Sequence, residues 1–113
     1  MLTLEETIFV NRDNYAEIKV INGQDDQPVD FAGATRMVLS FAESDEVVDT
    51  DVNSGAIDWA QGLGVIRFKL GGLSLPVGER AARLVVYDPG HTNGQVVVHE
   101  GGLSTLKMTF SDV

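Results

Sequence analysis

Alternation of apolar and polar residues dominates the chain and predicts β-strands. Four segments, residues 15–21, 35–41, 64–70 and 105–110, carry an apolar side chain at every second position. Because successive side chains of a strand point to opposite faces, each segment would have one buried and one solvated face, as antiparallel sheets do. The apolar positions are Ala16, Ile18, Val20, Met37, Leu39, Phe41, Ile66, Phe68, Leu70, Leu106, Met108 and Phe110.

Two further segments are apolar on both faces. Residues 82–88, "ARLVVYD", place Leu84 and Val86 on one face and further apolar side chains on the other. Residues 95–100, "QVVVHE", contain three successive valines. Such segments are typical of central strands or of strands covered by a neighbour. Residues 56–60, "AIDWA", are a shorter strand candidate.

Clusters of Gly, Asn, Asp and Pro lie between the apolar segments and predict turns. They occupy residues 22–28, 49–55, 60–64 and 88–94. Helical structure is expected only as single turns, within residues 41–50 and 71–76. Short strands with frequent turns predict an antiparallel all-β fold, a sandwich or a barrel, with about seven to nine strands in one domain over residues 1–113.

One shared core follows from the alternation, because each inward face must be buried against a second sheet. We expect this core to contain Met37, Leu39, Phe41, Ile66, Phe68, Leu84 and Val86. Trp59 is also expected in the core, since its neighbours Ile57 and Val65 are apolar.

Composition restricts the possible functions. The chain has 113 residues with a formal net charge of −9, and its eight Lys and Arg residues are scattered. This charge repels nucleic acids and anionic membranes, so neither is an expected partner. Absence of cysteine excludes disulfides and thiol catalysis. The first ten residues include Glu5 and Glu6 and no basic stretch, so we expect no secretory signal and synthesis in a cytoplasm.

The acidic turn at residues 49–55 is a candidate calcium site. Asp49, Asp51 and Asn53 present oxygen atoms at alternate positions, as calcium-binding loops do. However, Ser54 stands where an EF-hand loop needs glycine, and Ala60 stands where it needs glutamate. A solvated acidic turn is the alternative that we favour.

No other pattern predicts a catalytic, cofactor or metal site. The histidines, His91 and His99, lack the spacing of a zinc site, and both are expected at the surface. "GGLSLP" and "GGLSTL" lack the last glycine of a nucleophile elbow. "GLGVIRFKLGG" lacks the third glycine and the helix of a dinucleotide-binding loop. We therefore expect no enzymatic activity.

An ordered set of short motifs spans residues 15–110. "PVD" and "GAT" precede a strand, "GxIxxxxxxGxIxFxL" follows an acidic turn, and "LPxG" precedes "AxLVVYD". The matching residues are Pro28–Asp30, Gly33–Thr35, Gly55, Ile57, Gly64, Ile66, Phe68, Leu70, Leu75, Pro76, Gly78, Ala82 and Leu84–Asp88. The order resembles immunoglobulin-like β-sandwich domains of tailed-phage and prophage tail proteins, including the N-terminal domain of siphophage upper baseplate proteins.

The resemblance implies a structural or adaptor component of a phage or prophage tail, at a baseplate or a fibre attachment. Its partners would be other tail proteins or further copies of the chain. Its location would be the bacterial cytoplasm during synthesis and the virion tail after assembly. An immunoglobulin-like module that binds a ligand or a carbohydrate is the alternative. One departure is Arg80, which stands where the family has an aromatic residue; we expect Arg80 to cap backbone carbonyls or the corner to be looser.

The contacts of such an adaptor are expected along a strand edge. The segment Leu106–Phe110 lies near the chain end, where edge strands are common, and an unpaired edge invites pairing. The valines of residues 96–98 also predict a face that needs a cover.

Overall fold

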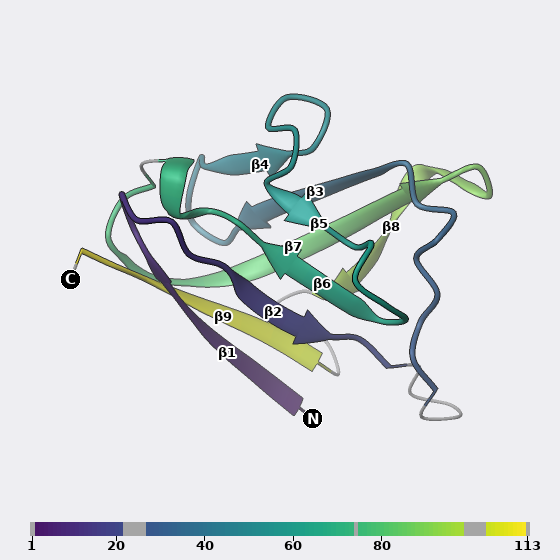
Figure 1. Cartoon of the computed structure of the whole chain (residues 1–113), viewed down its shortest axis with the longest axis horizontal. Helices are drawn as coiled ribbons and strands as arrows, with labels where there is room; N and C mark the ends of the chain where they lie inside the picture. Colours follow the sequence, from purple (N-terminus) through teal and green to yellow (C-terminus); the bar gives the residue numbers. More distant parts are fainter. Residues whose placement is uncertain (1, 22–26, 74, 99–103, 113) are drawn as a thin grey trace.

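Strands form most of the regular structure of the chain. The computed structural model describes residues 2–21, 27–73, 75–98 and 104–112. Within these residues it contains nine strands and one short 3₁₀ helix (Figure 1). The strands are β1 (Leu2–Phe9), β2 (Ala16–Lys19), β3 (Arg36–Phe41), β4 (Val47–Asp49), β5 (Ile57–Asp58), β6 (Val65–Phe68), β7 (Gly78–Asp88), β8 (His91–Val98) and β9 (Ser104–Ser111), and the helix is Gly71–Leu73.

The strands form two sheets that pack face to face in a sandwich-like arrangement. The larger sheet has the order β1-β9-β7-β3-β4, with β8 also paired to β7. The smaller sheet has the order β2-β6-β5 and lies in front of the larger one in Figure 1. The all-β prediction is confirmed, and so is the single helical turn predicted within residues 71–76.

Side chains from both sheets fill the space between them. All seven predicted core residues are buried, and the alternation of β3, β6 and β9 is the predicted one. Phe41 of β3 meets Phe110 of β9 edge to face, with ring centroids 5.5 Å apart. Trp59 is only half-buried and packs against this core from its margin. Burial of these apolar side chains is the main force that holds the two sheets together.

Strand β7 organises the larger sheet because it is long enough to pair with two strands along one edge. Its first half, Gly78–Ala82, pairs with β9, and its second half pairs with β8 from Leu84 onward. Strand β3 pairs along the opposite edge of β7. Strands β8 and β9 therefore follow one another along the same side of the sheet.

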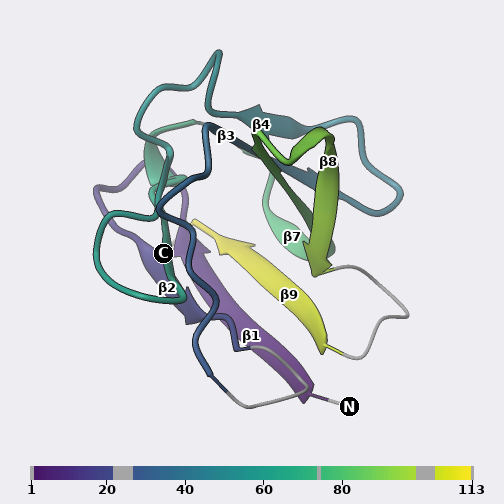
Figure 2. The ribbon, with the colours of Figure 1, turned by 90° about the vertical axis from the view of Figure 1, so that its right-hand side faces the viewer.

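The pairing of strand β1 contradicts two predictions. It pairs in parallel with β9 over its whole length, so the larger sheet is mixed rather than antiparallel. The pairing also places β9 inside the sheet, so Leu106–Phe110 is not an edge. Alternation did not reveal β1 because the charged residue Glu6 occupies a position on its inward face, between Leu4 and Ile8. Figure 2 shows β1 and β9 running side by side.

The predicted turn at residues 88–94 is shorter than expected. The chain turns at Pro89 and Gly90, and β8 begins directly at His91. Asp88 Oδ1 accepts a hydrogen bond from the backbone N–H of Gly90 at 2.9 Å, which closes the turn. The strand then continues through Asn93 and Gly94 because its register with β7 is shifted there by a bulge.

Arg80 caps a backbone carbonyl at the corner before β7, which was one of its two predicted roles. Its Nη1 donates a hydrogen bond to the carbonyl oxygen of Pro76 at 2.8 Å. Its guanidinium carbon lies 5.3 Å from the centre of the Phe110 ring. The arginine thus satisfies a backbone acceptor at the corner while its planar head covers the core aromatic.

Candidate binding face of the larger sheet

The outer face of the larger sheet carries a row of apolar side chains. Strand register places Val38 of β3 opposite Val85 of β7, and Val85 opposite Val96 of β8. Residues directly opposite one another share a face of the sheet, so the three valines form one row across it. Val96 is 50% exposed. Val47, on β4 beside the row, is 54% exposed. We call these four residues the valine row.

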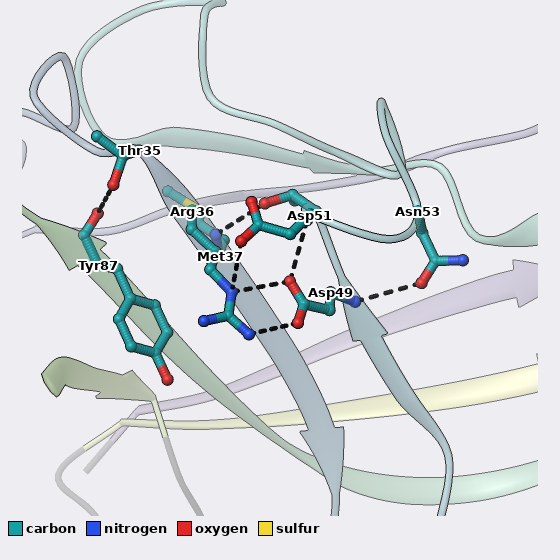
Figure 3. A network of polar contacts seen from close by, with 8 residues as sticks. Thr35, Arg36, Met37, Asp49, Asp51, Asn53 and Tyr87 are labelled. Carbon is teal, nitrogen blue, oxygen red and sulfur yellow. Dashed lines mark hydrogen bonds and ion pairs between the residues drawn. The ribbon is translucent and has the colours of Figure 1, made fainter. Parts of the chain in front are cut away.

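Figure 3 shows a polar network at the end of β4. It borders the valine row, because Asp49 of the network lies opposite Val38 in the register. Arg36 donates from Nε to Asp49 Oδ1 at 2.9 Å and from Nη2 to Asp49 Oδ2. Asp51 Oδ2 lies 3.4 Å from Arg36 Nε. Arginine suits this place because its planar head presents parallel N–H groups to both oxygens of one carboxylate.

The network shifts the protonation of its two central members. Hydrogen bonding to Arg36 lowers the pKa of Asp49 below its usual value, and the backbone N–H of Asp51 lowers it further. The same hydrogen bond with Asp49 raises the pKa of Arg36 above its usual value. Both groups are therefore charged throughout the physiological pH range.

The candidate calcium ligands are held by partners within the protein. Asp49 is bound by Arg36, and Asn53 Oδ1 accepts the backbone N–H of Asp49 at 3.3 Å. The turn between them is closed by hydrogen bonds from the backbone N–H groups of Val52 and Asn53 to the carbonyl oxygen of Asp49. The part of the chain that the structure describes contains no group of three or more acidic, His or Cys side chains that could hold a metal ion. Arg36 supplies the positive charge that a calcium ion would bring to this turn.

Tyr87 lies between the polar network and β8. The guanidinium carbon of Arg36 is 4.8 Å from the centre of the Tyr87 ring. On the β8 side, a Cβ atom at Gly94 would lie 2.5 Å from Val85 Cγ1 and 2.9 Å from Tyr87 Cε1. Gly94 also has a φ of 85°, a conformation that L side chains rarely adopt. Glycine is therefore needed for β8 to pass this closely over the tyrosine.

A shallow cleft of about 470 Å³ opens where the polar network meets the β7–β8 turn. His91 lies nearby, exposed as predicted, with Nδ1 3.0 Å from Asp88 Oδ1. The contact with His91 lowers the pKa of Asp88. These two residues stabilise the turn. His99, the other candidate histidine, lies outside the described residues. The residues that line the cleft itself are Thr35, Arg36, Asp51, Tyr87, Asp88, Pro89 and Thr92.

No motif of the sequence marked Arg36 and Tyr87 as residues of this face. Both occupy outward positions of strands whose inward faces were correctly predicted, so their exposure followed from the alternation. Their proximity did not, because 50 residues separate them along the chain and only the pairing of β3 with β7 brings them together. An arginine at an outward position before an acidic turn was the available signal.

Comparison with known proteins assigns the chain to no family. No protein-family model matches the chain, and no curated protein sequence matches it. The described residues also include no helix with the length and apolarity needed to cross a membrane.

Proposed function

We propose that this chain is a non-enzymatic structural or adaptor component of a phage or prophage tail that makes protein–protein contacts. The observation that carries this proposal is the valine row. It includes the exposed side chains of Val47 and Val96, and an arginine and a tyrosine lie at its border. Protein interfaces have an apolar core and are enriched in Tyr and Arg relative to the rest of the surface.

The proposal includes an immunoglobulin-like topology, which the strand order supports. In that fold one sheet contains strands B, E and D, and the other contains G, F and C, with C′ added in the variable type. Strands β2, β6 and β5 correspond to the first set, and β9, β7, β3 and β4 to the second. Further support is the ordered set of motifs from Pro28 to Asp88, which resembles phage tail domains.

A ligand- or carbohydrate-binding module is the second candidate. The cleft beside Tyr87 favours it, because Thr35, Asp51 and Thr92 supply polar groups next to an aromatic ring. The tyrosine ring is covered by Arg36, however, and the more exposed Tyr15 is likewise covered by Arg67 at 4.6 Å. A sugar would have to compete with these arginines for the ring faces that they cover, so protein contact is the better-supported function.

Co-expression with the proteins encoded by neighbouring tail genes tests the proposal. Size-exclusion chromatography with light scattering should show a complex with at least one of them. Val96→Lys should weaken that complex, because it places a charge in the valine row. Val52→Lys is the matched control, since Val52 is 79% exposed in the acidic turn and outside the row. A chain that stays separate from every tail protein contradicts the proposal.

A further inference from the structure

We propose that β1 is a docking edge that accepts an extended segment of another protein, with a Lys or Arg side chain placed beside Glu6. This inference rests on the proposed function, because it names the edge and the chemistry of the partner. It replaces β9, which the sequence suggested as the edge, with the strand that covers β9.

Hydrogen bonds at the end of β1 show which backbone groups face outward. The N–H of Val10 donates to the carbonyl oxygen of Ser111, toward β9. The N–H and C=O of Phe9 point the other way, where both bond the side chain of Asn14. Because these groups alternate in direction along a strand, the N–H and C=O groups of Glu5 and Thr7 also point away from β9.

The side chain of Asn14 ends this edge at Phe9, and the edge is open before it. Among the described residues no strand pairs with β1 on the side away from β9. Glu5 and Thr7 therefore offer donors and acceptors in the spacing that an added strand requires.

Other edges of the two sheets are less suited to strand addition. Strand β2 has four residues, β4 has three and β5 has two, so each offers only a short edge. Strand β8 is longer, but register shifts interrupt its pairing with β7, and bulges of this kind protect an edge. Strand β1 combines eight residues with an uninterrupted register.

The carboxylate of Glu6 favours a partner segment that carries a positive charge. Glu6 is half-buried on the inward face of β1, and no cation among the described residues pairs with it. Burial and repulsion by Glu17 raise its pKa. Glu17 itself forms an ion pair with Arg67, at 2.7 Å. A cation from an added strand would relieve the charge on Glu6.

The geometry of strand addition places that cation directly opposite Glu6. In an antiparallel addition that pairs through Glu5 and Thr7, the residue opposite Glu6 is in a non-hydrogen-bonded pair, where side chains are closest. Its neighbours two positions away would face Leu4 and Ile8, so they should be apolar. A second copy of β1 fits poorly, because the same antiparallel pairing would set Glu6 directly against Glu6 of its partner.

The probe is a capped peptide, Thr-Val-Thr-Lys-Thr-Val-Thr, titrated into the isotopically labelled full chain and followed by nuclear magnetic resonance. Amide signals of Glu5 and Thr7 should move more than those of Glu6 and Ile8. Replacing the central lysine of the peptide by glutamate should weaken binding by about tenfold. Added salt should also weaken the binding of the lysine peptide.

Variants of the chain test the same edge. Thr7→Pro should abolish binding and leave the melting midpoint nearly unchanged, because it removes an outward N–H and no bond to β9. Glu6→Gln should weaken binding by roughly twofold to fivefold. Glu46→Gln makes the same charge change near β4, at the opposite end of the sheet, and should have no effect. If Thr7→Pro does not fold, peptide binding to Glu6→Gln is compared with binding to Glu46→Gln, and weaker binding to Glu6→Gln alone supports the β1 edge.

The outcomes separate this inference from the proposed function. Equal binding of the lysine and glutamate peptides, or signal changes away from β1, would contradict the proposal that β1 is the docking edge. A dimer of the chain alone that Thr7→Pro dissociates would also overturn it, by assigning the edge to a second copy. Peptide binding at β1 without any complex with tail proteins would support the edge and contradict the proposed function. Tail complexes that tolerate Thr7→Pro would support the function and contradict the edge.

Discussion

Arg36 reaches diagonally from β3 to Asp49 on β4 and binds both oxygens of its carboxylate. The residue opposite Asp49 in the register is Val38, so Arg36 reaches Asp49 from the same face of β3, two residues before that position. The ion pair fastens the three-residue strand β4 to the sheet and fixes the first residue of the acidic turn. It also brings a positive charge to the place where the sequence suggested calcium.

Calcium should not stabilise the protein. At about 1–2 mM calcium, where weak sites begin to fill, the melting midpoint should be unchanged because Arg36 already binds Asp49. Differential scanning fluorimetry with and without calcium measures this. A clear rise that Asp51→Asn abolishes would contradict the prediction.

Asp49→Asn should destabilise the protein in a pH-dependent way. The pKa of Asp49 is lowered in the folded state, so its carboxylate stabilises the fold above the unfolded pKa of about 3.9. That contribution is lost as the pH falls through the lower, folded value. Denaturant titrations of both proteins should differ most near neutral pH and converge in acid. Asp30→Asn serves as the control, because Asp30 is exposed and, among the described residues, bonds the N–H of Ala32 alone.

Glu6→Gln should show the opposite dependence. Burial and Glu17 raise the pKa of Glu6, so its ionised form destabilises the fold at neutral pH. Stability should increase as the pH falls through the raised folded value toward the unfolded one of about 4.3. The variant should therefore melt higher than the parent at pH 7, and the difference should disappear in acid. A lower midpoint for the variant at pH 7 would show that Glu6 has a favourable partner.

Phe68→Ala should cost about 3–5 kcal/mol of unfolding free energy, because Phe68 is fully buried between the sheets. Urea titration measures the loss. Val52→Ala, at an exposed position, should change the free energy by no more than about 0.5 kcal/mol. A loss well under 1 kcal/mol for Phe68→Ala would mean that the inward face is wrongly assigned.

Gly94→Ala should cost about 1–3 kcal/mol, since an L side chain is strained at this positive φ and would overlap Val85 and Tyr87. Gly33→Ala is the matched control, because a Cβ there meets nothing within 4 Å. Thermal melts of the two variants give the comparison. Equal midpoints would show that β8 can move away from Tyr87 without loss.

The alternation of residues by itself determined the inward faces of the strands. Met37, Leu39 and Phe41 were predicted to face the core because a strand has a period of two, and a local rule of this kind does not depend on which strand lies alongside. The acidic turn after Asp49 was likewise readable from residue type and position, whereas capping by Arg80 was one of two alternatives that the family resemblance suggested.

Tertiary structure alone decided which strands are neighbours. Strand β1 lies parallel to β9, although the two come from opposite ends of the chain, and this pairing moved the free edge from Leu106–Phe110 to β1. The pairing of β3 with β7 brought Arg36 to Tyr87. Alternation carries no information on such neighbours, because any strand with one apolar face can pair with any other. The choice depends on how the whole set of apolar faces is buried at once, and that is a property of the folded chain.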